Sequence, residues 1–284
     1  MRMLRPTLVV LALPPLLMIC AFFVAPLAFL FVISFMTPSP EELFQYQVTI
    51  GNYLALAQDS FYWLILQRTL VTALIVLGTC LLLGYPVAVV VSRMTPRKRL
   101  VMLMVLLFPL MVSNVVRAYG WITILGREGL INVTLVDMSL IPYPLRMLNS
   151  AGAVGAGLLT ILLPYMIISV ANTLAGLDKS YQEAAQSLGA GPVRSFIHVT
   201  WPLSSPGVAA GLSLVFFLTL SAYVTITLLG GPRFKLLVSL VYDSVTTLQW
   251  PKAASLSFVL LAFALIVGAL IQAGLRPQRV QGKG

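Results

Sequence analysis

Residues Glu183–Pro202 read EAAQSLGAGPVRSFIHVTWP, a stretch of mixed polarity between two long apolar runs. Apolar residues that recur at i, i+3, i+4 and i+7 predict a short helix over Asp178–Leu188 with one narrow apolar stripe. The stripe consists of Tyr181, Ala184, Ala185 and Leu188. Gly189 and the Gly191-Pro192 pair would end this helix. Because two of its four residues are alanines with short side chains, the stripe protrudes little and fits the requirements for docking into a groove on another protein.

The composition indicates an integral membrane protein. Of the 284 residues, 59% are hydrophobic and 9% are charged, and the mean hydropathy is +0.98. A soluble domain carries about a quarter of charged residues. The formal net charge of +10 does not indicate nucleic-acid binding, because the basic residues lie mainly in short segments between apolar runs, as membrane topology requires.

Apolar runs of about 20 residues are long enough to cross a bilayer. The sequence contains six candidates, at Leu8–Phe35, Leu70–Val91, Leu100–Leu125, Ala151–Leu174, Leu203–Leu229 and Ala253–Leu275. These runs are too long and too continuously apolar for barrel strands, so we expect an all-α integral membrane protein with six transmembrane helices. Pro202 and Pro206 are expected to open the fifth helix.

The N-terminus resembles a secretory signal, with Arg2 and Arg5 ahead of an apolar run. That run is longer than the apolar region of a signal peptide, so we expect an uncleaved first helix. Lys and Arg are concentrated in the segments on the side of the termini, which predicts that both termini and the loop 178–202 are cytoplasmic. We expect residues 1–64 to form the first helix and a periplasmic loop, and residues 65–284 to form a five-helix core.

Motifs for enzyme chemistry are absent from the sequence. His198 is the single histidine, so there is no H-E-x-x-H pair, and TLAGLDKS lacks the glycines of a phosphate-binding P-loop. No Asp or Glu lies within a predicted span, which argues against an intramembrane aspartyl protease and a carboxylate proton relay. Cys20 and Cys80 fall inside apolar runs without metal-ligand spacing. We therefore expect no catalytic residue, metal site or cofactor in this chain, and no enzymatic activity.

Polar side chains within a span are costly and mark candidate pathways. In the third span, Asn114, Arg117 and Trp121 share one helical face, and Tyr119 is adjacent to them. We expect these residues to line a translocation pathway. The alternative is that Arg117 snorkels to the interface while Trp121 belongs to an aromatic belt.

The fifth span carries a polar residue at every second position, which is the period of a strand. A lone strand cannot satisfy its backbone in lipid, so we expect a helix that is loosened near Gly230 and lines a cavity. The polar residues are Thr219, Ser221, Tyr223, Thr225 and Thr227, and Asp243 beyond the span is the nearby acid. The alternative is that the hydroxyl groups bond to their own helix.

The stretch 183–202 resembles the EAA loop of the permease subunits of binding-protein-dependent ABC importers. That loop reads E-A-A, three residues, G, nine residues, I, one residue and L-P. At this spacing stand Glu183, Ala184, Ala185, Gly189 and Pro202. Val199 and Trp201 replace the Ile and the Leu, apolar for apolar, and Leu188 stands where an acidic residue is usual.

The resemblance implies the type I ABC importer permease fold and a division of labour among subunits. Glu183 and the two alanines would dock on a dimer of cytoplasmic ATPases, which would bind ATP and Mg²⁺, and Gly189 would shape the turn. A second permease subunit and a periplasmic or extracellular solute-binding protein would complete a transporter in the bacterial inner membrane. LGYPVAVVVSR, VVRAYGWITILGREGLIN and YVTITLLGGPRFKLLVSLVYDSV are similar to the spermidine/putrescine permease subgroup, and more to its PotB type than to its PotC type.

This subgroup implies a polyamine as the solute. Because no span carries an acid, Tyr119, Trp121 or Tyr223 would have to meet the ammonium groups through their ring faces, and Arg117 would repel them. Selectivity would then reside in the binding protein. Alternative solutes are an opine, an aminobutyrate-like amine, a phosphonate or ferric iron. A channel or secondary transporter that works without ATP is a further alternative, and it would not need the EAA loop.

Overall fold

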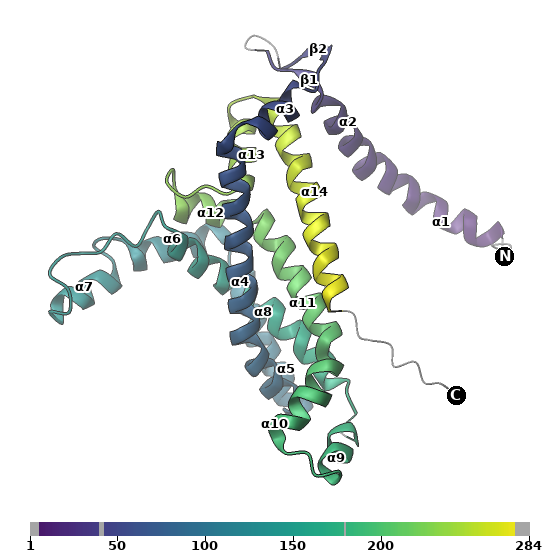
Figure 1. The fold of residues 1–284 in the computed structure, drawn as a ribbon, viewed down its shortest axis with the longest axis vertical. Helices are drawn as coiled ribbons and strands as arrows, with labels where there is room; N and C mark the ends of the chain where they lie inside the picture. Colours follow the sequence, from purple (N-terminus) through teal and green to yellow (C-terminus); the bar gives the residue numbers. More distant parts are fainter. Residues whose placement is uncertain (1–5, 40–42, 179, 276–284) are drawn as a thin grey trace. The chain divides into compact units, whose positions relative to one another are not determined.

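The computed structural model describes a mainly helical protein (Figure 1). The described residues are 6–39, 43–178 and 180–275. Arg2 and Arg5, the basic residues of the signal-like N-terminus, lie outside them. The chain divides into two compact units. The first unit is Met1–Trp63 with Leu240–Leu261, and the second is Leu64–Ser239 with Ala262–Gly284.

Five helices of the described residues are long and apolar enough to cross a membrane. They are Leu13–Ile33, Ser60–Ser92, Ala151–Ala175, Pro192–Ser221 and Trp250–Gly274. A sixth candidate is a pair of helical segments, Pro96–Met111 and Asn114–Asp137, bent by 86° at the break between them. The prediction of an all-α membrane fold is confirmed, with five continuous spans and one broken span.

In the first unit, a long apolar helix ends against a short one. Its segments are α1 (Pro6–Ile19), the π-helical η1 (Cys20–Val24) and α2 (Ala25–Ile33), followed by the paired strands β1 (Met36–Thr37) and β2 (Gln45–Val48), and by α3 (Gly51–Gln58). Asn52 of α3 donates from Nδ2 to the carbonyls of Ser34 and Met36 at 2.9 Å, and the Tyr53 hydroxyl donates to Ser34 Oγ at 2.8 Å. These bonds satisfy polar groups that the end of α2 leaves free.

The second unit holds most of the remaining helices. They are α4 (Ser60–Ser92, from Leu64 on), α5 (Pro96–Leu107), the 3₁₀ turn η2 (Phe108–Met111), α6 (Asn114–Leu125), α7 (Leu130–Asp137), α8 (Ala151–Ala175), α9 (Ser180–Ser187), α10 (Pro192–Ser195), the π-helical η3 (Phe196–Thr200), α11 (Trp201–Ser221) and α12 (Tyr223–Gly230). α13 (Leu237–Thr246) and α14 (Trp250–Gly274) each contribute residues to both units. α8 and α11 pack along each other and bury Leu158, Met166 and Phe216 completely.

Small residues let α8 and α11 approach closely. Gly207 and Gly211 are four residues apart on α11, which is the spacing of small-residue contacts between membrane helices. A Cβ atom at Gly207 would collide with the Thr173 side chain, and one at Gly211 would lie 2.8 Å from the Met166 sulfur. Ser169 Oγ donates to the Gly207 carbonyl at 2.9 Å and joins the two helices at the same place.

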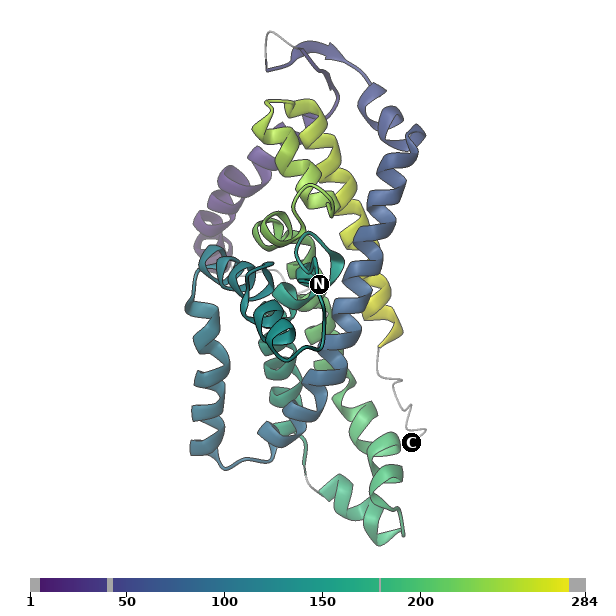
Figure 2. The same cartoon turned by 90° about the vertical axis from the view of Figure 1, so that its left-hand side faces the viewer.

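The predicted third span, Leu100–Leu125, is not one helix. α5 passes into η2, Val112 and Ser113 are extended, and a new helix starts at Asn114 (Figure 2). Pro109 in η2 has no N–H, and its ring disfavours the preceding α-helical turn, so the break has a local cause. The expectation of a continuous helix was wrong. It rested on hydropathy averaged over many residues, and such an average does not change when one proline removes a backbone hydrogen bond.

The predicted fifth span, Leu203–Leu229, begins earlier than expected. α10, η3 and α11 form one helix of 30 residues, Pro192–Ser221, so Pro202 and Pro206 lie inside it and do not open it. In η3, the Trp201 N–H bonds to the Phe196 carbonyl, five residues back. Pro202 has no N–H to donate, and this wider π-helical turn lets the helix continue past it. Residues 192–200, which the sequence analysis assigned to the loop 178–202, are therefore part of the membrane helix.

The same span also ends differently. The helix breaks at Ala222, with φ −79° and ψ 47°, and α12 resumes at Tyr223. The predicted loosening near Gly230 was wrong in position, because Gly230 closes α12 and the break lies one helix earlier.

Gly207→Ala is expected to weaken the α8–α11 contact by about 1–3 kcal/mol, because the added methyl group collides with Thr173. Gly155→Ala on α8 is the matched control, since no atom lies within 4 Å of its Cβ position. Thermal unfolding of the purified variants in detergent, followed by intrinsic fluorescence, should show a lowered midpoint for Gly207→Ala alone. Equal midpoints for the two variants would contradict the close contact.

Candidate functional site

The loop between α8 and α10 is organised around the short helix α9. Asp178 Oδ1 accepts a hydrogen bond from the Ser180 N–H at 2.9 Å, at the start of α9. This backbone bond, together with one from the Ser180 hydroxyl, lowers the pKa of Asp178 below its ordinary value. The hydrogen bonds from Ser180 to the ionised Asp178 therefore stabilise the folded loop fully at a pH above the ordinary pKa of Asp178. This stabilisation is lost as the pH falls through the lowered pKa.

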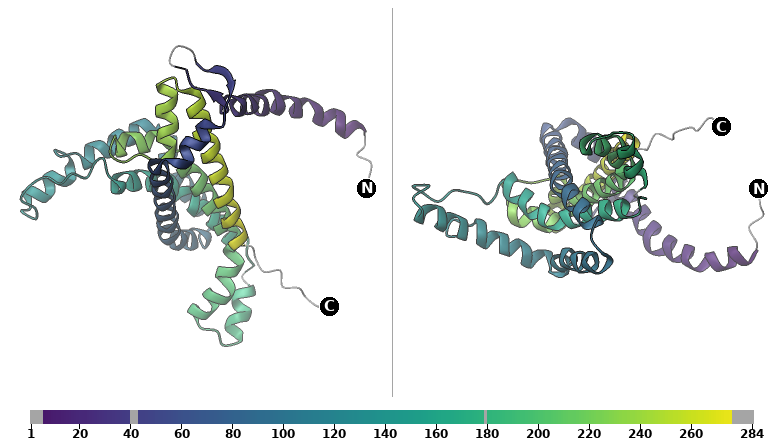
Figure 3. Two further views of the ribbon diagram at one scale, coloured as in Figure 1. Left: turned by 45° about the horizontal axis from the view of Figure 1, so that its top comes forward. Right: turned by 90° about the horizontal axis from the view of Figure 1, so that it is seen from below.

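The face that the sequence predicted to dock on a partner is exposed. Glu183 and Ala184 are exposed, and Ala185 is half-buried. Large apolar side chains of the same loop are also exposed, namely Leu188 (89%), Val193 (70%), Tyr181 (55%) and Ile197 (53%). α9 and α10, which carry them together with the start of η3, lie at one end of α11 (Figure 3). Exposed apolar side chains that gather in one place mark an interaction surface.

Gly189 ends α9 with a left-handed backbone. Its φ is +82°, its N–H bonds to the Gln186 carbonyl at 2.9 Å, and the next N–H, of Ala190, bonds to the Ala185 carbonyl at 3.0 Å. No atom lies within 4 Å of a Cβ built on Gly189. A side chain there would have room, but its backbone would be strained, so the turn itself requires glycine.

The loop is tied directly to the membrane helix. Gln182 Nε2 donates to Thr200 Oγ1 at 3.0 Å and so joins α9 to η3. A cavity of about 440 Å³ is lined by Arg93, Gln182 and Glu183 among others. Since η3 continues into α11 through Pro202, a displacement of α9 is passed to a helix and not to a flexible linker.

At the far end of α11 lies a second cavity, of about 250 Å³, which we call the polar cavity. Its polar lining residues are Asn114, Arg117, Tyr165, Ser221, Tyr223 and Thr225, and its lining contains no carboxylate. The cavity thus brings together five of the residues that the sequence predicted for the pathway. Because the helix breaks at Ala222, the end of α11 and the start of α12 both reach the cavity.

Arg117 holds the broken span together. Its Nη2 donates to the carbonyl of Pro109 at 2.6 Å and to that of Val112 at 2.8 Å. These carbonyls lie where η2 ends. The Pro109 carbonyl also accepts the Val112 N–H at 3.3 Å, whereas the Val112 carbonyl lies beyond η2, where the helical ladder has stopped. Among the described residues, the buried Nη1 atom of Arg117 has no hydrogen-bond partner. The guanidinium therefore bonds to the backbone through Nη2 and keeps one buried donor, Nη1, while its side chain borders both the polar cavity and a second, mainly apolar cavity.

The other predicted pathway residues lie elsewhere. Trp121 borders a separate, mainly apolar cavity of about 370 Å³, and its Nε1 donates to Thr160 Oγ1 at 3.3 Å. Tyr119 is 57% exposed and lines neither of these two cavities. Thr227 lies in α12 with its hydroxyl oxygen buried, and it also lines neither. Asp243 belongs to the first unit.

Tyr165 is a lining residue that the sequence analysis missed. It follows Pro164 in the middle of the apolar run that forms α8. A tyrosine this far from both membrane interfaces was the available signal, because aromatic belts place tyrosine at span ends. Two hydroxyl groups of the fifth span, those of Thr219 and Ser221, do bond back to carbonyls of their own helix.

The comparisons with known proteins agree with one another on the type of protein. The family model of the binding-protein-dependent transport system inner membrane component matches residues 81–276. The chain is 31% identical over 250 residues to the spermidine/putrescine transport system permease protein PotB of Haemophilus influenzae, with 87% of each chain covered.

Two solved structures share the fold. One is a bacterial ABC transporter involved in the import of the acidic polysaccharide alginate, with a TM-score of 0.76 at 18% identity over 96% of both chains. The other is a bacterial alginate ABC transporter in complex with an alginate pentasaccharide-bound periplasmic protein, with a TM-score of 0.74 at 17% identity over 95% of this chain and 94% of that one. These matches confirm the predicted permease fold.

Arg117→Ala removes two hydrogen bonds to backbone carbonyls, although the Pro109 carbonyl keeps the Val112 N–H as a donor. The change is expected to destabilise the second unit by about 1–3 kcal/mol. Arg127→Ala is the matched control, because the exposed Arg127 side chain makes no hydrogen bond within the described residues. Thermal unfolding in detergent should separate the two variants. A cysteine placed at Val112 should also react faster with a soluble maleimide when Arg117 is absent. Equal unfolding midpoints and equal labelling rates would refute this role of Arg117.

Proposed function

Since the chain belongs to the family of binding-protein-dependent transport system inner membrane components, the permeases of ABC importers, we propose that it forms the translocation pathway for a small polar solute. A cytoplasmic ATPase dimer drives it through the loop 178–202. As a permease of this family, the chain is a multi-pass protein of the inner membrane. ATP and Mg²⁺ belong to the ATPase, and a second permease subunit and a solute-binding protein complete the transporter.

The observation that carries this proposal is the junction of the loop with the membrane helix. The exposed residues of α9 and α10 offer a partner an apolar surface, and the left-handed Gly189 fixes the angle between the two short helices. The helix Pro192–Ser221 then runs from that surface to the polar cavity. A partner that moves the loop therefore moves part of the cavity lining, which is what coupling of ATP hydrolysis to transport requires.

The polar cavity is the proposed passage for the solute. Its lining combines an arginine side chain with hydroxyl and amide groups from four helices, α6, α8, α11 and α12. It lies where two helices are interrupted, and interrupted helices are tolerated in membranes only where they line a cavity or are buried in protein. We assign Asn114, Tyr165, Ser221 and Tyr223 to solute contact.

We propose a polyamine as the solute, on the 31% identity to the spermidine/putrescine permease. The polar cavity holds Arg117 and no carboxylate, so it does not select for ammonium groups by charge. The rings of Tyr165 and Tyr223 are the groups available for cation–π contact. Selection of the solute therefore falls to the binding protein, and the permease lets the delivered solute pass.

Gly189→Asp is expected to reduce the amount of ATPase that co-purifies with the tagged chain by roughly tenfold, because strain at φ +82° distorts the docking turn. Gly191→Asp is the matched control. It adds the same charge two residues away, where the backbone is ordinary, with φ −65°, and nothing lies within 4 Å of the Cβ. The measurement is a pull-down from detergent-solubilised host membranes.

Wild type and Gly191→Asp should retain the ATPase. If wild type retains none, coupling through this loop is refuted, and a transporter that works without ATP becomes the better reading. If both aspartate variants retain the ATPase equally, the left-handed turn is not what the partner recognises.

Spermidine and putrescine are expected to raise the ATPase activity of the reconstituted transporter several-fold when they are supplied with its solute-binding protein. The same assay with an opine, aminobutyrate, a phosphonate or ferric iron provides the comparison. A response to one of these, with none to the polyamines, would replace the polyamine and leave the permease function intact.

A further inference from the structure

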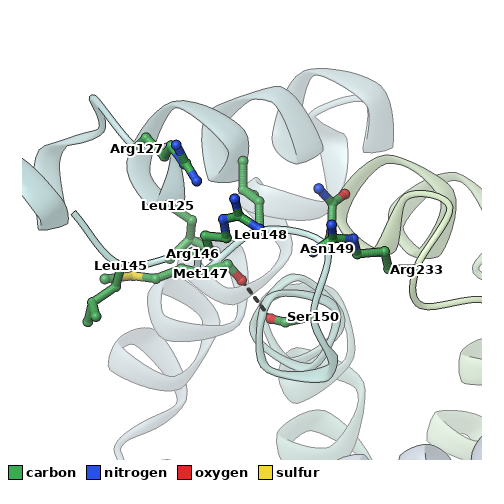
Figure 4. A pocket seen from close by; sticks show the side chains of 9 residues that line it. All are labelled: Leu125, Arg127, Leu145, Arg146, Met147, Leu148, Asn149, Ser150 and Arg233. Carbon is green, nitrogen blue, oxygen red and sulfur yellow. Dashed lines mark hydrogen bonds between the residues drawn. The ribbon is translucent and has the colours of Figure 1, made fainter. Parts of the chain in front are cut away.

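Three arginines converge on a cavity at the N-terminal end of α8. The cavity has a volume of about 470 Å³ and lies at the opposite end of α8 from the loop 178–202. Arg127, Arg146 and Arg233 point toward it from three sides (Figure 4). Its lining contains no Asp or Glu, and no hydrogen bond or ion pair joins the three guanidinium groups to another described residue. We call it the arginine cavity.

One buried side chain, that of Asn132, fixes the backbone next to two of these arginines. Asn132 is fully buried, and its Nδ2 donates to the carbonyls of Gly126 at 2.7 Å and Leu145 at 3.0 Å. Its Oδ1 accepts from the Leu145 N–H at 2.8 Å. Arg127 directly follows Gly126, and Arg146 directly follows Leu145. Asn132 therefore sets the separation of the two arginines.

The third arginine is positioned by contacts between Asn149, just before α8, and the end of α12. The Asn149 N–H bonds to the Leu229 carbonyl at 2.9 Å, and Asn149 has a φ of +58°. Gly231, with a φ of +54°, lies so close to the Asn149 side chain that a Cβ would collide with it. Arg233 follows two residues later. Two left-handed residues thus hold the end of α12 against the start of α8 and bring Arg233 to the cavity.

This arrangement concentrates positive charge without compensation from the cavity lining. All three arginines are exposed, so water and salt screen their mutual repulsion, but an anionic group that enters the cavity is attracted by all three at once. A guanidinium matches a carboxylate as a planar fork of two hydrogen bonds. The chemistry of the cavity therefore calls for an anionic group from outside this chain.

We infer that the arginine cavity receives a carboxylate side chain of the solute-binding protein; this rests on the proposed function. The 25 residues of α8 extend about 37 Å, enough to cross a bilayer core of about 30 Å. With the loop 178–202 on the ATPase, the cavity opens on the opposite side of the membrane, from which the binding protein delivers its solute.

A lipid phosphate is a less suitable occupant. The arginines belong to the segments that connect helices, 126–129, 138–150 and 231–236, and do not lie on the sides of spanning helices. Lipid phosphates lie level with helix ends, but they surround the sides of a helix bundle, whereas the lining of this cavity comes mainly from segments that connect helices. A transporter of the same fold has been solved in complex with a substrate-loaded periplasmic protein.

The test is the association of the binding protein with the complete transporter. The triple variant Arg127→Gln, Arg146→Gln, Arg233→Gln is assembled with its partners in nanodiscs of phosphatidylcholine. The control is Arg97→Gln with Lys98→Gln, which removes exposed charges at the other end of the protein. The probe is the soluble binding protein, identified by its stimulation of the wild-type ATPase. Association rates are measured at low and high salt, and basal ATPase activity reports assembly.

The triple variant should associate about tenfold more slowly at low salt and respond less to ionic strength, with unchanged basal ATPase activity. The control should behave as wild type, and a triple Arg→Lys variant should keep most of the rate because it keeps the charge. An unchanged rate and salt dependence with normal basal activity would overturn this inference alone. If the detergent-purified wild-type complex retains phosphatidylglycerol from the host membrane and the triple variant loses it, as seen by native mass spectrometry, while the association rate is unchanged, the cavity belongs to lipid and the inference is also overturned. A wild-type complex without ATPase activity would overturn the proposed function itself.

Discussion

A backbone carbonyl inside a bilayer must find its hydrogen-bond donor within the protein, and the second unit of this chain meets that requirement with Arg117. A helix ends at η2 in the middle of a span. The Arg117 guanidinium binds the Val112 carbonyl there and adds a second donor to the Pro109 carbonyl, which also accepts the Val112 N–H. The chain can then turn by 86° and start α6 at Asn114. Without that donor, the bend between η2 and α6 would leave the Val112 carbonyl without a hydrogen bond inside the bilayer. A straight helix would then be favoured, and it would place Asn114 on its side and not in the polar cavity.

A second interruption completes the cavity from the other side. The break at Ala222 exposes the end of α11 and the start of α12, and their polar residues Ser221 and Tyr223 line the same hollow as Asn114. The glycines at 207 and 211 keep the remainder of α11 in close contact with α8, so the interruption does not loosen the helix that carries it. Most of the polar lining of the cavity thus comes from residues near the two breaks, with Tyr165 added from the middle of α8.

Hydropathy and one loop pattern were sufficient to predict the fold class, the approximate positions of the spans and the end of the short loop helix at Gly189, because each of these depends on residues close together in the sequence. The breaks could not be predicted in the same way. Pro86, Pro164 and Pro206 all lie inside continuous helices, whereas Pro109 lies at a corner. A corner at proline needs a tertiary donor, and no local pattern reports one. The pathway residues near the breaks were predicted together, but Tyr119 and Trp121 face other surroundings, and Tyr165 was missed.

The helix from Pro192 to Ser221 also fixes a mechanical scale. Its 30 residues extend about 45 Å, so a tilt of about 10° around its midpoint would carry each end about 4 Å in opposite directions. That travel is larger than the diameter of a water molecule, although no hydrogen bond within the helix would need to break. If an ATPase drives this helix as we propose, a small angular displacement of the loop is enough, and the stiffness of the helix determines how much of that displacement reaches the polar cavity.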